Sequence, residues 1–165
     1  MVGNYLRVSK EEFEEYMQES SKLEDRVYSE DNLEDKNLMD VDKAWEGIFF
    51  LLTGASLSNI EDAKEPLSLI LNATELDPEQ DMGYGPALYN TVEQVKAISA
   101  EMNKISEEDL KKKFHPEKMM ELQIYPNMWD RGEEELEYLI DYYSILKEFY
   151  NTAAKEQQAV LFFIS

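Results

Sequence analysis

The stretch Ala159-Val160-Leu161-Phe162-Phe163-Ile164 is an unbroken apolar run near the end of the chain. Six apolar residues in a row are typical of a strand that is covered on both faces. Gly3–Val8, near the other end, is also prone to form a strand because it contains tyrosine, leucine and valine. Two terminal strands with helical patterns between them predict an α+β (mixed α/β) fold: a helix-rich domain on a small sheet that includes both ends of the chain.

The longest helix is predicted directly before the last strand, over Glu133–Glu156. Its inner face is expected to carry Leu136, Leu139, Ile140, Tyr143, Leu146, Tyr150, Ala153 and Ala154, which recur at helical spacing. A second helix is predicted over Val41–Thr53. It is apolar on nearly every side, which indicates a buried helix. Gly54 follows it, where a helix often ends in the left-handed conformation.

Three further helices are predicted to begin at capping boxes, in which a serine or threonine precedes an acidic or amide residue by three positions. They run over Lys10–Leu23, Thr91–Lys104 and Glu107–Phe114. The first is expected to turn Phe13, Tyr16, Met17 and Leu23 inward. Another short helix is expected to begin at Pro116, since proline suits the first turn.

The remaining segments are patterned less clearly. A short helical turn is expected around Asn32–Leu38, and a short strand over Ala87–Tyr89. Pro66–Leu71 is apolar but short, so it fits either a strand or a buried helical turn.

Composition excludes several classes of protein. The 165 residues fit one domain spanning 1–165. The absence of cysteine excludes disulfides, thiolate metal sites and thiol catalysis. No signal peptide and no membrane-length apolar segment is evident, so we expect a cytoplasmic protein that does not bind membranes. The net charge of −20 would repel nucleic acid, whose binding depends on lysine and arginine.

Several short motifs occur in the same order as in a known family. They are Asp42-Lys43-Ala44-Trp45, Leu51-Leu52-Thr53-Gly54, Pro66-Leu67, Gly83-Tyr84-Gly85-Pro86-Ala87, Ile124-Tyr125-Pro126 with Trp129, and Phe149-Tyr150 with Ala153-Ala154. Together they resemble the YfbM-like family of bacterial proteins, a domain of unknown function, along essentially the whole chain. The resemblance implies a mixed α/β bacterial domain in the cytoplasm, and it implies no particular activity.

No motif predicts a catalytic residue, a metal site or a cofactor. His115 is the only histidine, and no Gly-x-Ser-x-Gly element is present. Gly83–Gly85 lacks the remaining residues of a phosphate-binding loop. The acidic stretch Glu30–Asp35 suggests calcium, but a loop starting at Asp31 has Lys36 where an EF-hand needs glycine.

Two hypotheses of function remain. Ser9–Asp42 contains thirteen acidic and four basic residues, a net charge of −9, which favours a non-catalytic binding protein with an acidic face for a basic protein partner. Alternatively, the loops 81–89 and 124–130 form a cleft, and the chain is a small-ligand-binding protein or an enzyme. The candidate residues of that cleft are Asp81, Tyr84, Tyr89, Tyr125, Trp129 and Asp130. The oligomeric state stays open.

Overall fold

A five-stranded antiparallel sheet holds both ends of the chain in the computed structural model, which describes residues 1–29 and 35–165. The strands are β1 (Gly3–Val8), β2 (Leu38–Asp40), β3 (Thr74–Glu75), β4 (Leu88–Asn90) and β5 (Ala159–Ile164), and their order is β2-β1-β5-β4-β3. β1 pairs with β5 along its whole length, from Gly3 opposite Ile164 to Val8 opposite Ala159. The prediction that both terminal segments share one sheet is therefore confirmed.

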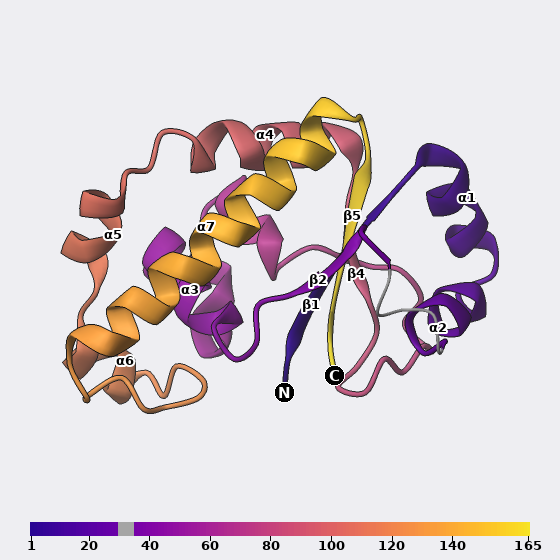
Figure 1. Ribbon diagram of the computed structural model, residues 1–165. Helices are drawn as coiled ribbons and strands as arrows, with labels where there is room; N and C mark the ends of the chain where they lie inside the picture. Colours follow the sequence, from indigo (N-terminus) through magenta and orange to yellow (C-terminus); the bar gives the residue numbers. More distant parts are fainter. Residues whose placement is uncertain (30–34) are drawn as a thin grey trace.

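Helices cover the two faces of this sheet unequally. Figure 1 shows α1 and α2 on one side of the strands, and α3 to α7 on the other side. The helices are α1 (Lys10–Gln18), α2 (Ser21–Val27), α3 (Trp45–Thr53), α4 (Val92–Met102), α5 (Glu107–Lys113), α6 (Pro116–Glu121) and α7 (Glu133–Lys155). Two 3-10 helices, η2 (Leu57–Asp62) and η3 (Leu67–Ile70), follow α3. The predicted α+β class is confirmed.

The central strand β5 divides the interior into two hydrophobic cores. Val160 and Phe162 face the larger core beneath α3, α4 and α7, while Leu161 and Phe163 face the smaller core beneath α1 and α2. Successive residues of a strand point to opposite faces, and helices cover both faces of this sheet. All four side chains are therefore buried. The apolar run at the end of the chain is thus a strand covered on both faces, as predicted.

Capping explains where several predicted helices begin. Ser9, Thr91 and Ser106 each form a capping box, at the starts of α1, α4 and α5. Pro116 is the first residue of α6, and α7 ends one residue before its predicted limit. Gly54 ends α3 with φ of 77°, in the left-handed region where glycine has no steric penalty.

The predicted helix Lys10–Leu23 is wrong in its second half. α1 ends at Gln18, Glu19 has φ of −146°, and α2 begins at Ser21. The Ser20 hydroxyl donates to Asp77 Oδ2 at 2.6 Å, and this distant contact holds the break in place. The new direction buries Leu23 in the smaller core, whereas Met17, expected to face inward, is 47% exposed.

The start of α3 and the segment before it also differ from expectation. Val41 N donates to Gly3 O at 2.9 Å, which continues the pairing of β2 with β1. The helix therefore begins only at Trp45, although Val41 is buried as expected. Leu38 begins β2 rather than ending a helical turn, and residues 32–34 of that turn lie outside the described residues.

The remaining short segments are resolved by the fold. The predicted strand near Ala87–Tyr89 is β4, shifted by one residue. The ambiguous Pro66–Leu71 contains η3, with Leu69 and Ile70 buried in the larger core. Within residues 1–29 and 35–165, no helix combines the length and apolar character that a membrane crossing requires.

Candidate functional site

The loop 81–89 places its three candidate residues in different surroundings. Asp81 is exposed and its Oδ1 accepts from Gly83 N at 2.8 Å, so this carboxylate shapes the turn. Tyr84 is 62% exposed and borders a hollow of about 190 Å³ together with Trp45. Tyr89 faces the smaller core, where its ring lies 5.0 Å from that of Phe13. Tyr89 therefore lies on the opposite face of the sheet from Trp45.

The loop 124–130 also divides its candidate residues between core and surface. Trp129 is 1% exposed, and its Nε1 donates to Ile124 O at 2.8 Å. Asp130 is exposed. Tyr125 stacks on Trp45, with ring centroids 5.3 Å apart. Since Trp45 also borders the hollow beside Tyr84, the two loops approach each other at this tryptophan.

A buried carboxylate that the sequence analysis did not select positions the second loop. Glu46 is 5% exposed within the apolar helix α3. Its Oε1 accepts from Leu57 N at 2.9 Å, and its Oε2 accepts from Tyr125 N at 2.8 Å. Glu46 therefore ties the start of η2 and the loop 124–130 to α3. A single acidic residue within an apolar helix was the sequence signal for this role.

The loop 124–130 and the start of α7 enclose a hollow of about 290 Å³, which we call the acid–aromatic hollow. It is lined by Asp42, Lys43, Pro126, Met128, Trp129, Glu134, Glu135 and Tyr138. The Tyr138 hydroxyl donates to Asp42 Oδ2 at 2.9 Å and accepts from Lys43 N at 3.1 Å. Burial, together with this bond to Asp42, raises the pKa of Tyr138 well above its usual range. The phenol therefore stays neutral and fixes one carboxylate of the hollow.

Glu135 is the most unusual residue of the acid–aromatic hollow. It is only 9% exposed, and its Oε2 has no hydrogen-bond partner among the residues that the structure describes. Glu135 precedes Leu139 by four residues, so it lies on the inner face of α7, one turn before the core begins. That spacing was the signal that the sequence analysis missed, because Glu135 stands among other acidic residues.

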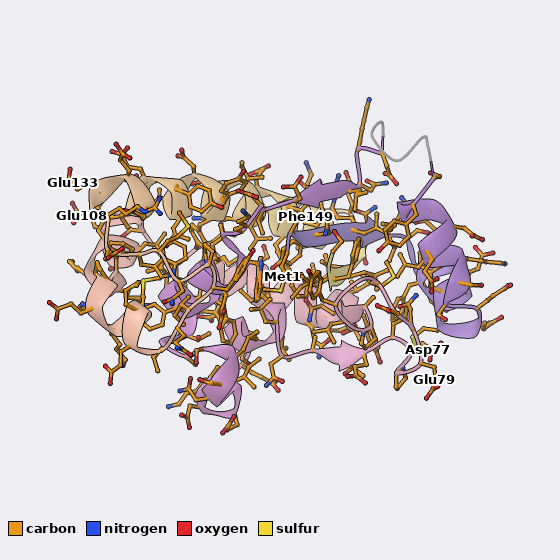
Figure 2. The ribbon with its side chains drawn as sticks, turned by 90° about the horizontal axis from the view of Figure 1, so that it is seen from below. Met1, Asp77, Glu79, Glu108, Glu133 and Phe149 are labelled. Carbon is orange, nitrogen blue, oxygen red and sulfur yellow. The ribbon has the colours of Figure 1, made fainter. Side chains whose placement is uncertain are left out.

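A second hollow of about 470 Å³, which we call the acidic groove, lies between α5 and α7. It is lined by Glu107, Lys111, Glu133, Leu136, Glu137, Ile140 and Asp141. Lys111 pairs with Glu107 at 2.7 Å, and the other three carboxylates form no ion pair with any described residue. Figure 2 shows Glu108 and Glu133 at the same end of the molecule, and Asp77 and Glu79 at the opposite end.

The N-terminal acidic stretch uses several of its carboxylates internally. Arg26 donates to Asp35 Oδ2 at 2.7 Å and to Glu12 Oε1 at 3.0 Å. Burial opposes ionisation of Asp35, but the bonds from Arg26 and from the Asn37 backbone outweigh it and lower the pKa of this carboxyl. Lys22 likewise pairs with Glu15 and Glu19. Residues 31–34 of the calcium loop considered at Asp31 lie outside the described residues, whereas Lys36 lies within them.

The described residues include no assembled metal centre. No group of three or more histidine, aspartate or glutamate side chains in residues 1–29 and 35–165 is arranged to hold a metal ion. His115 is exposed at the start of α6 and borders a hollow with Lys113 and Lys118, so its charged neighbours there are basic. Among the described residues that line this hollow, none is an acid that could orient the histidine as in a hydrolase triad.

Known proteins share both the sequence pattern and the fold. The model of a domain of unknown function, DUF1877, matches residues 1–163. Protein YfbM of Escherichia coli strain K12 is 28% identical over 131 residues, which cover 78% of this chain and 74% of that protein. The crystal structure of YfbM from Escherichia coli, described as a protein of unknown function, superposes with a TM-score of 0.73, covering 98% of both chains at 19% identity. The chain therefore belongs to the DUF1877 family, whose YfbM-like fold it shares.

Proposed function

We propose that this protein is a non-catalytic binding protein, and that it takes a basic protein partner at the end of the molecule formed by α5 and the first half of α7. The observation that carries the proposal is the pair of acidic hollows on neighbouring faces of one helix. Glu134, Glu135 and Tyr138 border the acid–aromatic hollow, whereas Glu133 and Glu137 border the acidic groove. With about 3.6 residues per turn, these two sets point to adjacent sides of α7.

Charge complementarity supports a basic partner. The chain carries 36 acidic and 16 basic residues, so its overall field attracts positively charged molecules. A hollowed surface adds shape to that attraction, since carboxylates in a concave wall focus the field where a side chain can enter. The acidic end at α7 has this shape, whereas the carboxylates of α1 and α2 are partly engaged by Lys22 and Arg26.

The alternative of a ligand cleft shared by the loops 81–89 and 124–130 has less support. Tyr84 borders the hollow beside Trp45, and Trp129 borders the acid–aromatic hollow. The described residues that line these two hollows do not overlap. The six candidate residues would therefore act in at least three separate surroundings.

Two triple variants of equal charge test the proposed function. In the first, Glu133, Glu134 and Glu137 on α7 are changed to glutamine; in the second, Glu11, Glu14 and Glu15 on α1 are changed. All six side chains are exposed, so both proteins should fold and each should lose three negative charges. Each variant and the native chain are tagged and used to capture partners from the source cell, at low salt and at about 0.5 M salt, where exposed charges are largely screened.

The expected result is capture of a protein with a basic isoelectric point by the native chain and by the α1 variant, and its loss from the α7 variant. High salt should weaken the capture, because association steered by exposed charges depends on ionic strength. Retention of the same partner by the α7 variant would refute the proposed surface. Loss from the α1 variant alone would move the binding face to the N-terminal acidic stretch.

A further inference from the structure

We infer that the acid–aromatic hollow receives the guanidinium group of an arginine side chain from the basic partner. This inference rests on the proposed function and assigns one contact within it. The first reason is Glu135, which is only 9% exposed and whose buried Oε2 has no hydrogen-bond partner among the described residues. A buried charge without a partner costs free energy, so such a group marks a place where a cation completes the structure.

The position of Glu135 on a rigid element strengthens this reading. It lies in the first turn of the 23-residue helix α7, so the helix backbone fixes its position at the edge of the hollow. Asp42 is the second acidic wall, and its Oδ2 is held by the Tyr138 hydroxyl. Asp42 and Glu135, two of the three carboxylates that border the hollow, are therefore held in place before any ligand arrives, which lowers the entropy cost of binding.

The other walls fit a planar, weakly hydrated cation. Trp129, Tyr138, Pro126 and Met128 supply aromatic and apolar surface around the acidic residues. A guanidinium group can stack on an aromatic ring while its five N–H donors reach carboxylates, whereas a lysine ammonium is a compact and strongly hydrated charge. Arginine is also favoured at the centres of interfaces for this reason. The combination of walls therefore selects arginine over lysine.

Lys43 is the residue that opposes a cation here. It borders the hollow, it is exposed, and it forms no ion pair with any residue in the described ranges. Its long side chain can turn toward solvent when another cation enters. Removing its charge by Lys43→Met should consequently tighten the binding of arginine, because like charges repel at close range.

A titration with a small arginine probe tests the inference on the intact protein. The probe is N-acetyl-arginine N-methylamide, and its neutral isostere with citrulline in place of arginine is the control. The chain has two tryptophans, so a proton–nitrogen correlation spectrum shows two indole signals. We expect the arginine probe to cause a saturable shift of the Trp129 indole signal and of the Glu135 and Tyr138 amide signals. The same compound with lysine in place of arginine, the lysine analogue, should cause a weaker shift. The citrulline control should cause none.

Single variants then locate the site. Glu135→Gln and Asp42→Asn should each weaken the arginine probe about tenfold, the usual effect of losing one charge-assisted hydrogen bond. Asparagine tolerates the left-handed backbone of Asp42, whose φ is 46°, so this variant should fold even if the other does not. Glu148→Gln removes the same charge from an exposed position further along α7, and it should bind the probe like the native chain.

Each remaining outcome would overturn the inference. These outcomes are no saturable shift, an equal response to citrulline or to the lysine analogue, and an equal loss in Glu148→Gln, which would indicate only long-range attraction. Capture of a basic partner that survives Glu135→Gln and Asp42→Asn but is lost in the α7 triple variant would refute the arginine site and leave the proposed function intact. Capture that survives in the single variants and in the α7 triple variant would refute both the arginine site and the proposed function.

Discussion

Two buried tyrosines, Tyr5 and Tyr150, should respond in opposite ways to the same substitution. Both are fully buried in the larger core, and their ring centroids lie 6.2 Å apart. The Tyr150 hydroxyl donates to Asn90 Oδ1 at 2.9 Å, whereas the Tyr5 hydroxyl has no hydrogen-bond partner among the described residues. Changing either residue to phenylalanine removes one oxygen atom and leaves the ring, so the variants differ only in what that oxygen contacts.

The expected magnitudes follow from these contacts. Tyr150→Phe removes a hydrogen bond and leaves Asn90 Oδ1 buried without its donor, which costs about 1–3 kcal/mol. Asn90 stays in place because its Nδ2 still donates to Leu69 O at 2.9 Å, so its acceptor cannot simply turn away. Tyr5→Phe removes a polar group that is buried at a cost of about 1–3 kcal/mol when unpaired, so the free energy of unfolding should stay the same or increase.

Thermal and urea unfolding of the three proteins measure this difference. For a chain of this length, about 1 kcal/mol shifts Tm by roughly 2–4 °C. Tyr150→Phe should therefore melt several degrees below the native protein, and Tyr5→Phe at or above it. An equal loss of stability in both variants would show that the Tyr5 hydroxyl is hydrogen-bonded in solution, and the argument from its isolation would be wrong.

Three further perturbations test the packing and the buried polar groups. Glu46→Gln should lower the free energy of unfolding by about 1.5–3 kcal/mol in urea, because an amide cannot accept both backbone bonds, while the exposed Glu148→Gln should leave it unchanged. Gly3→Ala should cost about 1–3 kcal/mol in the same assay, because the added Cβ would lie 2.7 Å from Trp45 Cβ. Burial raises the pKa of Tyr143 to about 12, so the neutral phenol stabilises the fold fully below the unfolded pKa of about 10. This contribution is lost as the pH rises toward the folded pKa. The urea midpoint should therefore fall between pH ~10 and pH ~12, and a constant midpoint would contradict the argument.

The elements that the sequence predicted correctly are those with a strong local signal. The strand Ala159–Ile164 and the helix α7 are long and strongly patterned, and the capping boxes define the starts of three helices. β3 contains only Thr74 and Glu75, and both are exposed, so no hydrophobic pattern could reveal it. The break after α1 depends on the contact between Ser20 and Asp77, which are 57 residues apart. Such features are set by tertiary contacts, which local patterns do not contain.

The candidate site was harder to predict because aromatic residues in loops serve two purposes. Trp129 looked like the wall of a ligand cleft, yet it is mostly a core residue. Gly47 in α3 makes room for it, because a Cβ at this position would lie 2.9 Å from Trp129 Cη2. Glycine is a poor helix former, so its presence inside an apolar helix was a sign that another side chain approaches closely. The sequence did not say which side chain that would be.

The inner face of α7 connects the larger core with the proposed binding site. From Leu139 onward this face packs into the larger core, but one turn earlier the same face carries Glu135 instead of an apolar residue. An apolar side chain at this position would extend the core over Trp129 and avoid burying a carboxylate. Natural sequences break a local rule of this kind mainly where function requires it. The buried carboxylate of Glu135, rather than the excess of negative charge over the whole surface, is therefore the feature on which the proposed arginine site depends.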